Sequence, residues 1–292
     1  MSRNDTRLGV QDVNLGDSPA PAVAVGPELD SNNNSTAFKW TCPTEIVDLP
    51  SEEQFYPEGH PLQGKTTVEI NFMTAKEEDI LASKALLRKG VAIDRMLESL
   101  IADKRIKASD LLLGDKNALT VAARITGYGA DYDTKVTCPY CGNGTEHTFD
   151  LAEVGHKDPS LAISEHEVEV TPRRTFIFEM PMTKVKVECR LMTGADEQAL
   201  MKSAQRKQKH KLNSSALLEQ FRTFVVSVDG DSSVDTLASF ITNMPARDSR
   251  HLRKVYGSIT PNVDMTQLFE CDECGEESAL EIPLTAEFFW PQ

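Results

Sequence analysis

The feature that most constrains this chain is a pair of Cys-x-x-Cys motifs that lie far apart in the sequence. Cys138 and Cys141 belong to the stretch VTCPYCG, and Cys271 and Cys274 belong to FECDECG. Each motif is followed by a glycine and is flanked by segments with the alternation of β-strands. Two such knuckles together supply four thiolates in the tetrahedral arrangement of a structural zinc ribbon. The sequence therefore predicts one structural zinc ion per chain, bound by these four cysteines.

The 129 residues between Cys141 and Cys271 do not argue against a shared metal ion. The entropy cost of closing a loop grows with the logarithm of its length, so a loop of about 130 residues costs only about 2 kcal/mol more than one of about 15 residues. The binding of a structural zinc ion supplies about 10–16 kcal/mol of free energy, which exceeds this cost. We therefore expect the intervening chain to fold as an insertion between the two halves of the ribbon.

Other interpretations of the cysteines stay open. Each pair alone is compatible with a redox-active dithiol or with buried thiols, and a single iron ion accepts the same four thiolates. Catalytic zinc needs an open coordination position, which four thiolates do not leave. His147 is an alternative ligand, although its place in the outgoing strand favours a surface histidine. Cys189 is predicted to lie in the core, and Cys42 shows no ligand pattern.

The predicted fold class is α+β: a mainly helical N-terminal region, an antiparallel β meander and a split four-cysteine zinc ribbon closed by the C-terminal segment. Residues 1–37 are rich in Asn, Ser, Pro, Gly and Asp and show no hydrophobic periodicity, so we expect a flexible arm. This arm is either an inert tail or a segment that orders on a partner. The expected domains are the arm (1–37), a mainly helical domain (38–133), the zinc-ribbon module (134–155 plus 262–292) and an inserted β-meander and helical subdomain (156–261).

The helical domain shows a clear start signal. Thr74 and Glu77 have the spacing of a capping box, in which each side chain binds a free backbone amide at the helix start. Gly90 and Gly127 are predicted to end the first and third helices. Hydrophobic periodicity predicts these elements in the domain: a strand over 66–73 and helices over 75–89, 91–103 and 115–126.

The insertion and the C-terminal segment contain alternating stretches. In the most regular one, Val187 and Cys189 are predicted to face the core and Glu188 to face solvent, which is typical of an antiparallel meander with one wet face. The predicted strands cover 166–171, 175–180, 183–191, 263–270 and 278–284. The predicted helices run from Thr193 to Lys211, over 217–228, and from Pro245 to Gly257.

The charge balance excludes some classes of protein. Forty-five acidic and 31 basic residues give a net charge of −14, which excludes a uniformly basic nucleic-acid-binding chain. The basic run KSAQRKQKHK (202–211) is interpreted either as a solvated helix end or as a contact for nucleic acid or an acidic protein. No apolar run reaches the roughly 20 residues of a membrane span, and no signal peptide is recognisable, so we expect cytosolic synthesis and no membrane partner. We recognise no catalytic or nucleotide-binding motif, so we expect neither an enzyme nor a small-molecule substrate.

The sequence closes on the aromatic residues Phe288, Phe289 and Trp290. Large aromatic side chains are seldom left in water, because burying each one is worth roughly 2 kcal/mol. Two interpretations follow. The aromatics either pack against the chain's own domain or anchor it in a binding partner.

Six stretches of the chain, in this order, are FYPEGHPL (55–62), EINFMTAKEEDIL (69–81), LLLGDKNALTVAARITGYG (111–129), VTCPYCG (136–142), CDECG (271–275) and FFWP (288–291). Together they resemble the baseplate hub and hub-assembly proteins of contractile-tailed, T-even-like bacteriophages, over residues 40–292. The resemblance implies a hub component or an assembly factor that contacts other baseplate hub or tail proteins. It also implies synthesis in the cytoplasm of the infected cell, with or without retention in the tail baseplate of the virion. It implies no enzymatic site.

Two other classes of function compete with this one. A nucleic-acid-associated zinc-ribbon factor is the alternative, and it requires a basic face, for which residues 202–211 are the candidate. A cell-wall-degrading enzyme is the third class, but no acid/base pair is identifiable for it.

Overall fold

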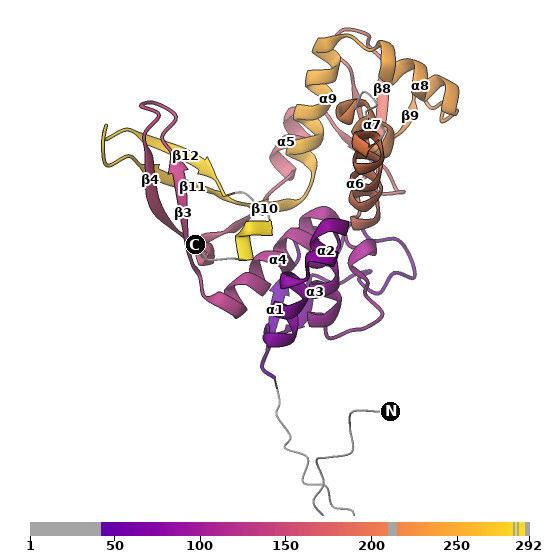
Figure 1. Ribbon diagram of the computed structural model, residues 1–292. Helices are drawn as coiled ribbons and strands as arrows, with labels where there is room; N and C mark the ends of the chain where they lie inside the picture. The colour runs from indigo at the N-terminus through magenta and orange to yellow at the C-terminus, as the bar shows by residue number, and fades with distance from the viewer. Residues whose placement is uncertain (1–41, 210–214, 283, 285, 290–292) are drawn as a thin grey trace, which may run out of the picture. The chain divides into compact units, whose positions relative to one another are not determined.

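The computed structural model describes residues 42–209, 215–282, 284 and 286–289 (Figure 1). The predicted flexible arm, residues 1–37, lies outside these ranges. From Cys42 onward the chain forms one compact unit that combines helices with antiparallel strands. This composition confirms the predicted mixture of helix and antiparallel sheet.

The first part of the described chain is mainly helical, as predicted. A two-stranded antiparallel sheet precedes the helices, with Val47 opposite Val68. Both valines are buried in the main hydrophobic core. The elements of this part are β1 (Thr44–Asp48), β2 (Thr67–Asn71), α1 (Ala75–Ala82), α2 (Lys84–Lys89), α3 (Ala92–Leu100), the 3-10 helix η1 (Ala108–Asp110) and α4 (Leu113–Tyr128).

Helix α1 begins at the predicted capping box. The Thr74 side chain accepts a hydrogen bond from the Lys76 amide, and the Thr74 amide donates to Glu77 at 3.1 Å. The second carboxylate oxygen of Glu77 accepts from the Ser99 hydroxyl at 2.6 Å. The cap therefore also ties the start of α1 to the end of α3.

The predicted helix over 75–89 is interrupted. Ser83 leaves the helical conformation, with φ −68° and ψ 103°, so the segment forms α1 and α2 instead of one helix. Gly90 ends α2 as predicted, in a left-handed conformation with φ +68°. Glycine adopts this conformation without the steric cost of a side chain, and the end of the flexible Met201 side chain lies next to it.

Two other helix ends differ from the prediction. Helix α3 stops at Leu100 because Ile101 turns to form an antiparallel bridge with Ile70. Helix α4 continues through the predicted stop at Gly127 to Tyr128.

In its described residues, the inserted segment contains a four-stranded antiparallel sheet in the order β6-β7-β8-β9, together with five helices. The predicted meander of three strands is therefore present, but its first strand is short. Its elements are α5 (Ser160–Glu165), β6 (Glu169–Val170), β7 (Phe176–Glu179), β8 (Lys186–Cys189), α6 (Gly194–Lys209), α7 (Ala216–Phe224), β9 (Val225–Val228), α8 (Val234–Asn243) and α9 (Ala246–Ile259).

The predicted helix over 217–228 is wrong in its last four residues. Helix α7 ends at Phe224, and the chain continues directly into strand β9, where Val187 of β8 pairs with Val228. Three valines in four positions favour an extended backbone, and the free edge of β8 supplies the partner. Helix α8 was not predicted, and α9 passes the expected stop at Gly257.

The predicted wet face of the meander is wrong at Glu188. This carboxylate is buried and accepts hydrogen bonds from the hydroxyls of Thr175 at 2.6 Å and Ser227 at 2.7 Å. Arg173 adds an ion pair at 3.7 Å. These partners lower the pKa of Glu188 although its burial alone would raise it.

The remaining elements lie before and after the inserted segment and include the strands that carry the four cysteines. Strand β5 pairs with β10, so the chain enters and leaves the inserted segment at adjacent points. The bounds are β3 (Asp131–Thr137), β4 (Gly144–Asp150), the 3-10 helix η2 (Leu151–Glu153), β5 (Gly155–Lys157), β10 (Asn262–Asp264), β11 (Thr266–Glu270), β12 (Glu277–Glu281) and the 3-10 helix η3 (Ala286–Phe289).

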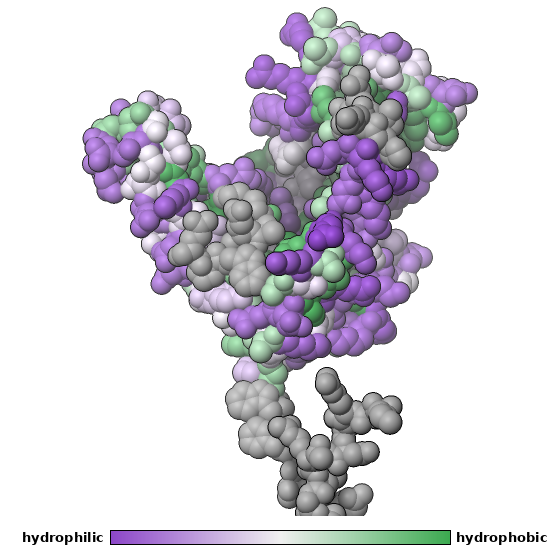
Figure 2. Space-filling model, in the orientation of Figure 1, coloured by the Kyte–Doolittle hydropathy of each residue, from purple (hydrophilic) through white to green (hydrophobic). Residues whose placement is uncertain are grey.

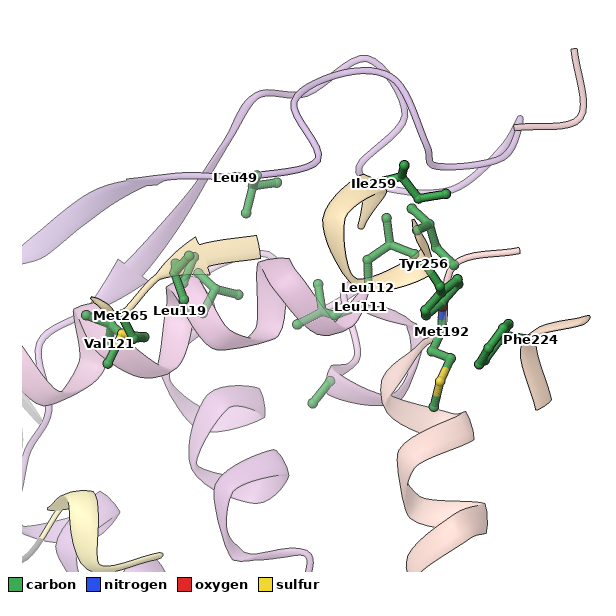
Figure 3. Close-up of a cluster of buried hydrophobic side chains, with 14 of the residues drawn as sticks. Leu49, Leu111, Leu112, Leu119, Val121, Met192, Phe224, Tyr256, Ile259 and Met265 are labelled. Carbon is green, nitrogen blue, oxygen red and sulfur yellow. The ribbon is translucent and has the colours of Figure 1, made fainter. Parts of the chain in front are cut away.

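Helix α4 lies at the centre of the packing. Figure 3 shows its Leu119 and Val121 in a buried cluster that also includes Met265, which follows β10. In the same cluster Phe224 stacks on Tyr256 with ring centroids 3.9 Å apart. One core therefore joins the helical part, the inserted segment and the C-terminal segment. Among the described helices, none has both the length and the apolar character needed to cross a bilayer.

Candidate metal centre

Two β-hairpins present the four cysteines. Strand β3 pairs with β4 along its whole length, and β11 pairs in the same way with β12. The hairpins lie side by side (Figure 1), and the side chain of Gln267 joins them. Its amide oxygen accepts from the Asp150 amide at 3.2 Å, and its amide nitrogen donates to the Asp150 carbonyl at 2.5 Å. The turns of the hairpins are therefore held at the same end of the structure.

The two turns have the same backbone conformation. In the first, the Gly142 amide donates to the Cys138 carbonyl at 3.0 Å, and Gly142 has φ +73°. In the second, the Gly275 amide donates to the Cys271 carbonyl at 2.8 Å, and Gly275 has φ +69°. Glycine adopts this left-handed conformation without the steric cost of a side chain. The Cys-x-x-Cys-Gly motif therefore encodes the turn as well as the sulfurs.

The four sulfurs form a cluster with the size of a tetrahedral metal site. Cys138 Sγ lies 3.8 Å from Cys274 Sγ, and Cys141 Sγ lies 3.7 Å from Cys271 Sγ. All four sulfurs lie within 4.8 Å of one another. A tetrahedral ion with metal–sulfur bonds of about 2.3 Å requires sulfur–sulfur distances of about 3.8 Å. The residues therefore fit one metal ion, with each hairpin contributing two ligands.

The ionisation of the thiols also favours a bound cation. The backbone amide of Cys141 is the main group that lowers the pKa of Cys138, to about 7. The amide of Glu276 lowers the pKa of Cys274, but partial desolvation and the neighbouring sulfurs outweigh it and raise that pKa to about 12. Four sulfurs this close cannot all be thiolates without a positive charge between them. A divalent ion supplies that charge.

A small apolar cluster lies under the sulfurs. Phe269 is fully buried and packs with Cys138 and Cys271, and Val136 and Leu280 cover its sides. Cys141 and Cys274 are exposed, so each hairpin contributes one buried and one exposed sulfur. Four protein ligands fill a tetrahedral site and leave no position for water or substrate.

His147 does not join the sulfur cluster. Within the described residues, the group that could hold a metal contains the four cysteines alone. The half-buried ring of His147 meets Phe149 and Phe269 edge-on, with centroid distances of 4.6 and 5.2 Å. The histidine contributes to the packing between the hairpins.

The other two cysteines lie elsewhere. Cys189 is fully buried in the main core, and burial raises the pKa of its thiol well above the usual range. This agrees with the predicted core position. Cys42 is half-buried, and its thiol donates to the Phe72 carbonyl at 3.4 Å.

The aromatic residues near the C-terminus pack in the interior of the described chain. Phe288 and Phe289 are fully buried in the chain's own core, and Phe288 packs against Tyr132 at 5.2 Å. The Phe288 carbonyl accepts a hydrogen bond from Arg124 at 3.1 Å. The burial of Phe288 and Phe289 favours the interpretation in which the aromatics pack against the chain's own domain. Trp290 lies outside the described residues.

Sequence reasoning missed a buried polar site at the start of α4. Asp115 is fully buried and accepts hydrogen bonds from the Ser51 amide at 2.9 Å, the Ser51 hydroxyl at 2.6 Å and the Tyr56 hydroxyl at 2.6 Å. Tyr56 in turn accepts from the Leu112 amide at 3.1 Å. The residues come from two stretches that are distant in sequence, so no local spacing signals the contact. The irregular segment before β2 is pinned in this way to α4.

The fold and the site together define a class of protein: an α+β protein with a closed four-cysteine cluster suited to a structural metal ion. The chain belongs to the T4 bacteriophage base plate protein family, whose profile matches residues 44–290. This match confirms the resemblance to proteins of T-even-like phage baseplates. No curated protein and no solved structure matches the chain.

Proposed function

We propose that this protein is a non-enzymatic component or assembly factor of the phage baseplate hub that acts through contacts with other baseplate or tail proteins. The match to the base plate family over residues 44–290 carries the proposal. The sulfur cluster supports it, since a closed site suits a rigid binding body and not a catalyst. The proposed location is the host cytoplasm during assembly and then the tail baseplate.

The proposed metal is one structural zinc ion on Cys138, Cys141, Cys271 and Cys274. Zinc takes four thiolates in tetrahedral geometry without redox chemistry, and the two hairpin turns match each other in conformation. The ion would fasten the C-terminal segment to the middle of the chain. Both ends of the insertion would then be fixed, which keeps the surfaces of the folded unit in a constant arrangement.

The charge of the hairpins argues against the nucleic-acid alternative. Residues 131–150 and 262–281 carry 11 acidic residues and a single basic residue, Lys135. Four thiolates around a divalent ion add a further net negative charge. Phosphate groups are repelled by such a surface, so the hairpins are unsuited to the role of a nucleic-acid-binding ribbon.

A phage in which this gene carries an early stop codon tests the proposal. We expect infected cells to accumulate tail proteins without complete baseplates, as seen by electron microscopy of lysates, and to recover when the wild-type protein is supplied from a plasmid. The double variant Cys138→Ser/Cys274→Ser should complement poorly, whereas Cys189→Ser should complement. Normal tails in the absence of the protein would contradict the proposed role.

A further inference from the structure

The charges of this chain are distributed unevenly. Residues 156–261 carry 16 basic and 13 acidic residues, although the whole chain has a net charge of −14. No Lys or Arg follows Lys254, so the β11–β12 hairpin has no positive charge of its own. The inserted segment and the hairpin are therefore opposite in charge.

A basic surface lies where α2 and α6 meet. It consists of Arg88 and Lys89 at the end of α2 and of Lys202, Arg206 and Lys209 on α6. The spacing along α6 places its three cations on one face of the helix. All five side chains are exposed, and none has an ion pair with a carboxylate in the part of the chain that the structure describes. The surface around α6 is hydrophilic in Figure 2.

Apolar side chains border the basic surface. Leu87 of α2 is 38% exposed, and Met201 of α6 is 39% exposed. Gln205, which lies on the same face of α6 as the cations, donates to the Arg88 carbonyl at 3.4 Å and links the two helices. A shallow depression is lined by Lys202, Gln205, Arg206 and Lys209. The basic surface thus offers both positive charge and apolar contact area.

The outer face of the β11–β12 hairpin has the complementary character. Leu268 is 66% exposed at its centre, and Glu270, Glu277 and Glu281 surround it. Glu270 lies directly opposite Glu277 in the strand register, an arrangement of like charges that destabilises a sheet. Within the described residues none of these glutamates has an ion pair. We call Leu268 and the three glutamates the acidic face.

We infer that the acidic face of one copy of this chain docks on the basic surface of a second copy. The two surfaces match in charge, and each has exposed apolar side chains to cover. They also match in length: Lys202 to Lys209 spans about 10 Å of helix, and Glu277 to Glu281 spans about 13 Å of strand. The contact joins two different surfaces, so a growing assembly always has one free acidic face and one free basic surface at its ends. Assembly therefore continues into a ring or an open chain. The inference is independent of the baseplate role.

Nucleic acid fits the basic surface less well. The phosphate backbone of a nucleic acid offers no apolar group to Leu87 and Met201, and it must approach a molecule whose net charge is −14. The acidic face brings a local cluster of carboxylates together with Leu268. Binding of DNA is therefore an outcome that the experiment has to distinguish.

Sedimentation velocity of the full chain at increasing concentration, in 50 mM and 500 mM NaCl, measures the contact. We expect association that weakens at least about tenfold at the higher salt concentration, since exposed charge pairs are screened. The basic-to-acidic variant Lys202→Glu/Arg206→Glu/Lys209→Glu should remain monomeric. The acidic-to-basic variant Glu270→Lys/Glu277→Lys/Glu281→Lys should also remain monomeric.

A mixture of the two variants provides the specific test. The first variant keeps the native acidic face, and the second keeps the native basic surface, while the two reversed surfaces also attract each other. The mixture should therefore associate although neither variant does alone. The control variant Arg247→Glu/Arg250→Glu/Lys254→Glu has the same charge change on exposed positions of α9 and should associate like the wild type. Circular dichroism checks that each variant is folded. If a triple variant does not fold, neutral Gln substitutions replace it.

Three results would overturn the inference. The first is a wild-type chain that stays monomeric at 50 mM NaCl at all concentrations. The second is association that the control variant abolishes or that the two charge variants leave unchanged. The third is salt-dependent binding of a labelled 20-nucleotide DNA that is lost with the Lys202, Arg206 and Lys209 substitutions, in a chain that does not self-associate.

Discussion

A lysine that is buried in a protein needs carboxylates around it, and Lys116 has two. Its ammonium group lies 2.6 Å from Asp94 of α3 and 2.5 Å from Glu197 of α6. Burial favours the neutral amine, but the hydrogen bonds to both carboxylates outweigh it and raise the pKa of Lys116. The charged lysine therefore links α4 to one helix of the N-terminal part and to one helix of the insertion.

The substitution Lys116→Met removes this link. We expect it to lower the free energy of unfolding by about 3 kcal/mol, because Asp94 is left buried without its counter-ion. Urea unfolding followed by circular dichroism measures the change. The control is Lys135→Met, which removes an exposed lysine 3.9 Å from Glu146 and should leave stability unchanged. Equal effects of the two substitutions would contradict this account.

Asp248 gives the protein a predictable dependence on pH. Burial opposes its ionisation, but hydrogen bonds from the amides of Met182 and Thr183, at 2.8 and 3.0 Å, and from the Thr183 hydroxyl lower its pKa. A lowered pKa in the folded state stabilises the protein above the unfolded pKa of about 3.9, and this contribution is lost as pH falls through the folded pKa.

We therefore expect Asp248→Asn to cost about 2 kcal/mol at pH 7, and the difference from the wild type to shrink below about pH 4. Urea unfolding of both proteins between pH 7 and pH 3 measures it, and other carboxylates cancel in the comparison. A difference that grows as pH falls would show that the sign is wrong.

At the scale of elements, the packing of α4 depends on a residue without a side chain. A Cβ atom on Gly114 would overlap the backbone carbonyl of Pro261, the residue directly before β10. Gly257, in contrast, lies in the last turn of α9 with no atom near the place of its missing Cβ. The packing therefore excludes a side chain at Gly114 but leaves room for one at Gly257.

Alanine substitutions should separate them. Gly114→Ala should destabilise the protein by about 2 kcal/mol, because backbone atoms must move apart. Gly257→Ala should stabilise it by about 0.5–1 kcal/mol, because alanine loses less backbone entropy in a helix. Thermal unfolding of both variants provides the measurement, and a shift in the same direction for both would contradict the packing described for α4.

Some local signals in the sequence were reliable, although the glycines at positions 127 and 257 did not end their helices. The capping box at Thr74 and the glycine at position 90 were predicted, because each depends on neighbours within one turn of helix. Strand β9 was missed because its conformation depends on pairing with β8, and the burial of Glu188 was missed because its partners lie on other strands. Alternation along one strand does not reveal what covers either face.

At the scale of the whole molecule, the proximity of the two cysteine pairs could be predicted across 129 residues, because both have the same Cys-x-x-Cys-Gly motif between two strands. What the sequence did not reveal is that α4 connects the parts, because Asp115 and Lys116 find partners 59 to 81 residues away. The place of Phe288 and Phe289 was also left between two interpretations, since burial and partner binding require the same residue types.

Removal of the proposed zinc ion should affect the molecule unevenly. We expect incubation with a strong chelator to increase hydrogen exchange in residues 131–150 and 262–281, because the two hairpins lose the metal ion that they share. Phe176 and Phe178 of the β6–β9 sheet are buried in the main core, which is separate from the small cluster under the sulfurs, so this sheet should keep its protection. Mass spectrometry of peptides after exchange measures both. Equal loss of protection in both regions would contradict a local structural role of the metal.

The most direct test of the account is the metal content of the purified full chain, measured by inductively coupled plasma mass spectrometry. One zinc ion per chain is predicted for the wild type and for Cys189→Ser, and none for Cys138→Ser/Cys274→Ser. A wild-type protein that contains no stoichiometric metal when it is prepared without chelators, or that contains iron in place of zinc, would contradict the claim that a structural zinc ion closes this fold.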